Sequence, residues 1–113
     1  MHELALCGAI ADIATRKSGE RHVAAVHVRI GRLRQVVPDT LTFCWSMVIT
    51  GTDLDGCELD VERVDAVLRC RQCDAEHPMG AAVAFACASC GSLDVAVLSG
   101  DEFDVTALDL AEV

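Results

Sequence analysis

Hydrophobic residues near the start of the chain recur every three or four positions, which is the spacing of one face of an α-helix. The stripe consists of Leu6, Ile10 and Ile13, with Leu4 and Ala14 beside it. Gly19 follows two basic residues, and both features are typical of a helix C-terminus. Cys7 lies on or beside the apolar stripe, so we expect it to be a buried structural thiol.

Over residues 22–30 the pattern changes to alternation, which predicts a half-buried strand. Its inward face is expected to hold Ala24, Val26, Val28 and Ile30. His27 and Arg29 fall on the other face. His22 and His27 are five positions apart, hence on opposite faces of a strand, so they cannot share a metal ion. We expect both to be surface histidines.

A second helix is predicted to begin at Pro38-Asp39 and to end before Gly51. Proline suits the first helical position, and an acid suits the positive end of the helix dipole. The buried stripe is expected to comprise Leu41, Trp45 and Val48, with Cys44 beside it.

The remaining apolar patterns predict strands. Alternation over residues 57–61 slips by one position at Arg63, which indicates a bulge or a bend. Further strands are predicted over residues 93–97 and 103–113. Together these elements predict an α+β domain, in which two helices pack on a small mixed or antiparallel sheet.

Two C-x-x-C pairs interrupt this pattern, with 13 residues between them; their cysteines are Cys70, Cys73, Cys87 and Cys90. Four thiolates that converge on one ion are the ligands of a structural Zn²⁺ site. Asp74 and Gly91 directly follow the two pairs, and both residue types tolerate the positive φ of a tight turn. We therefore predict a Cys₄ zinc ribbon at residues 68–99, inserted into an α+β domain made of residues 1–67 and 100–113.

Composition narrows the classes of function. Hydrophobic residues make up 52% of the 113 residues, which suffices for a packed core, and the low aromatic fraction of 4% makes that core aliphatic. A net charge of −9 with no basic patch argues against nucleic-acid binding. The longest apolar run, residues 81–88, is far too short to cross a bilayer.

The seven cysteines help to predict the cellular compartment of the protein. The N-terminus shows no pattern of a signal peptide, so we expect a cytoplasmic protein with reduced thiols that bind metal. Disulfides or loose thiols are the alternative. No motif of a serine hydrolase, a zinc protease or a phosphate-binding loop occurs, and a closed Cys₄ site has no open position for a substrate. We therefore expect that the chain is not an enzyme.

The first three residues offer a different metal site. Met1-His2-Glu3 provides an α-amine, an amide and an imidazole nitrogen in adjacent chelate rings, with a carboxylate within reach. Nitrogen ligands in one plane favour Ni(II) or Cu(II) over Zn(II). Because amines titrate near pH 8 and imidazoles near 6.5, binding should weaken as the pH falls through about 6 to 7. A helix N-terminus repels cations, however, and many proteins begin with Met-His by accident.

Short motifs along essentially the whole chain favour a nickel site at the N-terminus over a chance Met-His. They are Met1-His2-Glu3-Leu4, Ile30-Gly31, Pro38-Asp39, the two C-x-x-C pairs with Gly91, and Ser99-Gly100. This combination resembles the HypA/HybF family of hydrogenase nickel-incorporation proteins. One departure is Asp74, where the family often has glycine.

The resemblance implies a small α+β nickel-binding domain with an inserted structural zinc ribbon. It implies a metallochaperone that delivers Ni(II) to the large-subunit precursor of [NiFe]-hydrogenase, together with a nickel-linked GTPase, and in some organisms also serves urease. His2 matches the essential nickel ligand of the family, the Met1 amine and Glu3 match groups of the same site, and Asp39 matches an acid proposed near nickel.

Partners of other kinds are not expected. We predict no nucleic-acid partner, no membrane insertion, and a monomer or weak homodimer. The alternative function is a zinc-ribbon protein-interaction module in an assembly or transcription complex, without nickel cargo.

Overall fold

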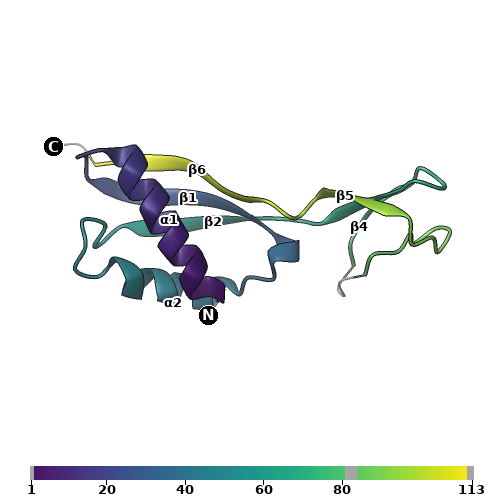
Figure 1. Cartoon of the computed structure of the whole chain (residues 1–113), viewed down its shortest axis with the longest axis horizontal. Helices are drawn as coiled ribbons and strands as arrows, with labels where there is room; N and C mark the ends of the chain where they lie inside the picture. The colour runs from purple at the N-terminus through teal and green to yellow at the C-terminus, as the bar shows by residue number, and fades with distance from the viewer. Residues whose placement is uncertain (1, 81–83, 112–113) are drawn as a thin grey trace. The chain divides into compact units, whose positions relative to one another are not determined.

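The computed structural model describes residues 2–80 and 84–111 (Figure 1). In chain order the elements are α1 (His2–Ser18), β1 (Val23–Gly31), the 3₁₀ helix η1 (Arg32–Arg34), α2 (Pro38–Ile49), β2 (Glu58–Val64), β3 (Val67–Cys70), β4 (Glu76–Pro78), β5 (Val95–Ser99) and β6 (Phe103–Leu110). The strands form two three-stranded sheets, with the orders β2-β1-β6 and β4-β3-β5. The predicted α+β class, with two helices and small sheets, is therefore confirmed.

The chain divides by packing into two compact units. The first unit contains Met1–Arg29, Val36–Glu62 and Asp104–Val113, and the second contains Ile30–Gln35 and Arg63–Phe103. The first unit holds both helices, and the second holds the β4-β3-β5 sheet and the paired cysteines. The domain boundaries expected from the sequence stay a prediction.

The β2-β1-β6 sheet is mixed. His27 pairs with Asp60, and Arg29 pairs with Glu62, so β1 and β2 advance together and are parallel. The backbone hydrogen bonds that set β6 antiparallel to β1 join Ala111 to His22 and Gly31 to Glu102. Parallel neighbours require a crossover connection, and α2 lies within it.

The core of the first unit lies between this sheet and the helices, and α1 crosses one face of the sheet (Figure 1). Fully or nearly fully buried are Cys7, Ile10 and Ala14 of α1, Val23, Val26 and Val28 of β1, and Leu41, Trp45 and Ile49 of α2. The Cys7 thiol donates a hydrogen bond to the Leu41 carbonyl oxygen at 3.3 Å, and so joins the two helices. Cys7 is buried, as expected.

Three predicted stripes are confirmed in part and differ from the structure at one or both ends. Leu6 and Ile13 are only half-buried, because the line of α1 that meets α2 runs through Cys7. In β1, Val23 is buried and Ala24 is exposed, so the expected alternation holds only from Val26 onward. In α2 the last buried residue is Ile49, whereas Val48 is half-buried.

The slip in the hydrophobic alternation at Arg63 reflects a change from one sheet to the other. The chain leaves the first sheet at Val64 and enters the second at Val67, with Ala66 only 1% exposed between them. There β3 pairs antiparallel with both β4 and β5. A small core holds this sheet, formed by Ala66, Leu68 and Met79 with Leu33 and Val95 packed against them.

Two glycines let backbones touch inside the second unit. A Cβ on Gly31 would lie 2.0 Å from the carbonyl oxygen of Gly100, and one on Gly100 would lie 2.5 Å from the Cα of Ala66. The Leu33 N–H then donates to the Gly100 carbonyl oxygen at 2.7 Å. Ile30-Gly31 and Ser99-Gly100 are thus the two sides of one close backbone contact.

Two short elements were not predicted, and two predicted strands have different bounds. The inner loop of the cysteine-rich segment contains a short strand, β4, and the segment after β1 forms η1. The strand predicted from residue 93 begins at Val95, and Leu93 lies outside it with 80% of its surface exposed. The last strand ends at Leu110, and residues 112–113 lie outside the described part of the chain.

Candidate metal centre

The two C-x-x-C segments form matching turns. In the first, the Asp74 N–H donates to the Cys70 carbonyl oxygen, and the Cys70 N–H donates to the Ala75 carbonyl oxygen, both at 2.9 Å. The second repeats this pattern, with bonds from Gly91 to Cys87 and from Cys87 to Ser92. Each turn therefore aims two thiols in the same way, one at each end of C-x-x-C.

The four sulfur atoms converge. Cys70 Sγ and Cys90 Sγ are 3.6 Å apart, as are Cys73 Sγ and Cys87 Sγ. All four sulfurs lie within 4.8 Å of one another. A tetrahedral ion with Zn–S bonds of about 2.3 Å separates its ligands by about 3.8 Å. An all-sulfur donor set at this spacing fits Zn²⁺.

Backbone amides prepare two of these thiols for metal binding. The Cys90 N–H points at Cys87 Sγ, and the Cys73 N–H points at Cys70 Sγ, each at 3.5 Å. These hydrogen bonds stabilise the thiolates, so the pKa of Cys70 is lowered and the pKa of Cys87 is lowered to about 5. Thiolates are the form that binds metal.

Asp74 takes the place of a turn glycine without losing the turn. Its φ is +63°, close to the +75° of Gly91 at the matching position. Its carboxylate accepts a hydrogen bond from Arg69 Nε at 2.8 Å, which holds the side chain outside the cluster. The departure from the family pattern at this residue is therefore compatible with the same backbone.

His77 approaches the cluster from β4. Its Nε2 lies 3.3 Å from Cys87 Sγ. No role was predicted for His77, because the strand that carries it is only three residues long and shows no repeating pattern. Its position makes it a neighbour of the cluster, in which the four cysteines alone offer the number of ligands that a tetrahedral ion needs.

Two of the predicted nickel residues, His2 and Glu3, lie at the start of α1. His2 is the first helical residue and Glu3 the second, whereas Met1 lies outside the described residues. Glu3 Oε2 accepts a hydrogen bond from the Val37 N–H at 3.2 Å, directly before α2 begins at Pro38. The structure thus brings Glu3 to the start of α2, which carries Asp39 in its first turn.

Comparisons with known proteins identify the family of this chain. A family model described as hydrogenase/urease nickel incorporation, metallochaperone, HypA, matches residues 1–110. The hydrogenase maturation factor HypA of Geotalea uraniireducens is 42% identical over 110 residues, which cover 97% of this chain and 99% of the relative. That of Desulfosudis oleivorans is 39% identical, with 99% of this chain and 100% of the relative covered.

The fold also has a solved counterpart. The solution structure of the Ni metallochaperone HypA from Helicobacter pylori matches with a TM-score of 0.66 at 19% identity, over 97% of each chain. Among the described residues, no helix is long and apolar enough to cross a membrane. The family match spans both the start of α1 and the cysteine cluster. This chain therefore belongs to the HypA family of hydrogenase/urease nickel-incorporation metallochaperones.

Proposed function

We propose that this chain binds Ni(II) at its N-terminus and delivers it to the large subunit of a [NiFe]-hydrogenase during maturation. The observation that carries the proposal is the family match over residues 1–110, because it includes the N-terminal residues as well as the cysteine pairs. The nickel ion is cargo, and the chain that transfers it needs no catalytic site.

Nickel is held by the Met1 amine and by the amide and imidazole nitrogens of His2. The position of His2 at the start of α1 supports this ligand set. The first N–H groups of a helix are not used by the helix's own carbonyl groups. A metal that displaces the His2 amide proton therefore breaks no helical hydrogen bond.

Carboxylates offset the positive charge of the ion at this helix end. Glu3 is at hand in the first turn of α1, and its hydrogen bond to the Val37 N–H fixes it near the start of α2. Asp39 lies in the first turn of α2 and adds a second acid. Negative side chains at two helix N-termini counter the helix dipoles, which otherwise repel a cation.

The Cys₄ cluster holds a structural Zn²⁺. Its four sulfurs fill the coordination sphere, so the ion offers no open position to nickel or to a substrate. Because the core of the second unit is small, the metal supplies much of the energy that folds it. Zinc folds the ribbon, while the N-terminus carries the cargo.

Release follows from the position of the site on a chain end. Docking on the hydrogenase precursor peels Met1-His2-Glu3 away from the body of the protein and dismantles the ligand set. The partners are this precursor and the nickel-linked GTPase of hydrogenase maturation, in the cytoplasm, with urease as a further target in some organisms. The working form is a monomer or weak homodimer.

An extended N-terminus tests this proposal. One glycine added before Met1 turns the amine ligand into an amide, so nickel transfer to the hydrogenase precursor should be lost. A glycine added after Val113 is the matched control and should transfer normally. Both proteins are compared by hydrogenase activity in cells that lack the native chaperone. Full hydrogenase activity with the N-terminal extension would contradict the proposal.

A further inference from the structure

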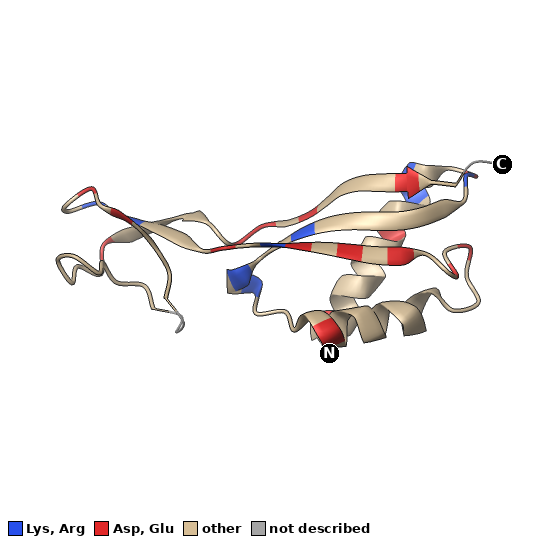
Figure 2. Cartoon of the chain, turned by 180° about the vertical axis from the view of Figure 1, so that it is seen from behind, with Lys and Arg blue, Asp and Glu red and all other residues tan. Residues whose placement is uncertain are grey.

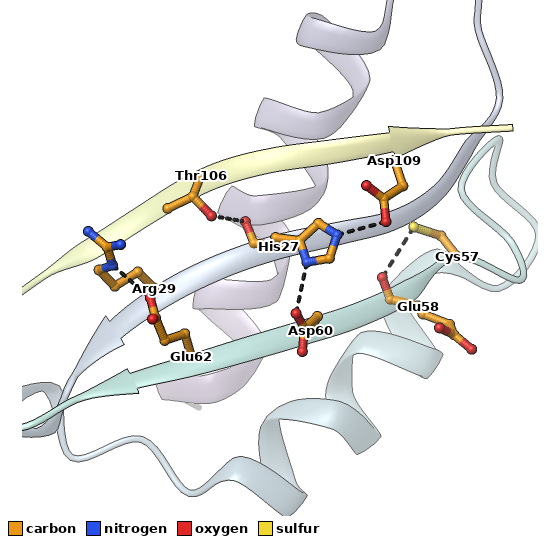
Figure 3. A network of polar contacts seen from close by, with 8 residues as sticks. All are labelled: His27, Arg29, Cys57, Glu58, Asp60, Glu62, Thr106 and Asp109. Atoms are coloured by element: carbon orange, nitrogen blue, oxygen red, sulfur yellow. Dashed lines mark hydrogen bonds and ion pairs between the residues drawn. The ribbon is translucent and has the colours of Figure 1, made fainter.

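His27 joins all three strands of the mixed sheet (Figure 3). Its Nδ1 lies 2.8 Å from Asp60 Oδ2 on β2, and its Nε2 lies 2.8 Å from Asp109 Oδ2 on β6. The ring thus stands on the central strand, between carboxylates of both edge strands. In Figure 3 the ring and the carboxylates of Asp60 and Asp109 lie on the side of the sheet away from α1, and Figure 2 shows further acidic positions along β2.

The two carboxylate contacts determine how many protons the His27 ring must carry. A neutral imidazole has one N–H donor and one bare nitrogen acceptor, whereas an ionised carboxylate only accepts. Two contacts of 2.8 Å to two carboxylates are therefore both attractive only when the ring carries both protons and a positive charge. With one proton, one nitrogen lone pair would face a carboxylate oxygen.

Other titratable or charged groups surround the ring. They are Asp60 and Glu58 on β2, Asp109 on β6, Arg29 further along β1, and the Cys57 thiol. Arg29 is itself bonded to Glu62 Oε2 at 2.8 Å, so its charge is partly matched. Burial raises the pKa of Cys57 above its ordinary value, which favours the neutral thiol. The field at the ring is dominated by carboxylates.

We propose that His27 is a proton-operated clamp: when protonated it bonds to a carboxylate on each edge strand, and when it loses its proton it keeps only one of these two side-chain contacts. The two carboxylates compete for a single N–H once the ring is neutral. The clamp follows from the sheet geometry alone and does not depend on the nickel proposal.

The clamp has a defined pH direction. Hydrogen bonds to Asp109 and Asp60 raise the pKa of His27 above that of an unfolded chain, which is about 6.5. Its contribution to stability is therefore fully present below about pH 6.5 and is lost as the pH rises through the higher folded-state value.

A nuclear magnetic resonance titration of the zinc-loaded full chain tests the clamp. The ring nitrogens of His27 are followed from about pH 5.5 to about pH 9.5. The expected midpoint lies above 6.5, and Asp60→Asn and Asp109→Asn should each move it down toward the ordinary value. A wild-type midpoint at or below 6.5, or no movement in either variant, would overturn the proposal.

Urea unfolding gives a second readout. Wild-type protein should need less urea to unfold as the pH rises from about 6 to about 9, and His27→Gln should lack that component. His22→Gln makes the same substitution in the same unit without touching the clamp, so it should keep the wild-type slope. Identical slopes for wild type and His27→Gln would contradict the clamp. If His27→Gln does not fold, the nuclear magnetic resonance titration of the wild-type protein still tests the proposal.

Discussion

Glu3 shows how one residue serves two helices. It lies in the first turn of α1, and its carboxylate accepts the Val37 N–H that precedes α2. That hydrogen bond is the main reason why the pKa of Glu3 is lowered. The carboxylate therefore stays ionised over the whole range in which amines and imidazoles titrate. The pH dependence of nickel binding should come from nitrogen ligands and not from this acid.

Replacing the carboxylate by an amide tests this division of roles. Glu3→Gln should weaken nickel binding by roughly tenfold, as for other groups that support a metal site, at every pH between about 6 and 8. The fall in affinity toward acid pH should keep the wild-type midpoint. Calorimetric titration at several pH values measures both quantities.

Glu20→Gln is the control for this experiment. It removes the same charge from the exposed turn after α1 and should leave nickel affinity unchanged. A Glu3→Gln protein with wild-type affinity would remove Glu3 from the site. A displaced midpoint would show that its carboxylate titrates together with the ligands.

Single residues also show what a sequence can and cannot predict. The four cysteines could be assigned because their spacing is local, and Asp74 because an acid tolerates a positive φ. The partners of His27 could not be assigned, because Asp60 and Asp109 come from separate strands whose register depends on the whole sheet. Alternation placed His27 on the correct face and gave no hint of which residues meet it.

At the scale of elements, the close contact between the Gly31 and Gly100 backbones fixes the second unit. It lets η1 reach the small core, where Leu33 packs against Ala66, Leu68 and Met79. Arg32 Nη1 also donates to the Met79 carbonyl oxygen at 3.0 Å. The segment between β1 and α2 thereby becomes part of the unit that holds the cysteines.

Two glycine-to-alanine substitutions separate this contact from general effects of glycine. Gly31→Ala should lower the free energy of unfolding by about 1–3 kcal/mol or more, because its Cβ has no room beside Gly100. Gly8→Ala meets nothing within 4 Å and lies inside α1, so it should raise that free energy by roughly 0.5–1 kcal/mol. Urea unfolding measures both changes. A neutral Gly31→Ala variant would show that the contact can relax without cost.

The sequence predicted the long elements and missed the short ones. Periodicity over many residues identifies α1, α2 and β1, since several turns or pleats repeat the same pattern. It fails for β4 and η1, which are three residues each and are held by neighbours and not by their own pattern. The slip at Arg63 was visible in the sequence. Its meaning, a change from one sheet to another, depends on partners that are distant in the chain.

For the whole molecule, the two units differ in what holds them together. The first unit has a core built from two helices and a sheet, whereas the second has a small core next to four thiols. A small apolar core is stable only with a further constraint such as a metal. We therefore expect the zinc ion to fold the second unit and to matter little for the first.

Metal removal tests this expectation. A zinc chelator should abolish amide protection from hydrogen exchange in β3 and β5, while α1 and α2 keep theirs. Exchange is followed by nuclear magnetic resonance before and after chelation, and added zinc should restore the protection. Persistent protection of β3 and β5 in the metal-free protein would show that the apolar contacts suffice.

Nickel binding at the N-terminus can be tested in a single experiment. Tag-free, zinc-loaded protein is titrated with Ni(II) in a calorimeter near pH 7.5, beside His2→Ala. We predict one saturable site with a dissociation constant of about 1 μM or lower, or about −8 kcal/mol, that is lost in the variant. No site in the wild type, or equal binding in His2→Ala, would contradict the account and leave the cysteine cluster as the metal chemistry of this chain.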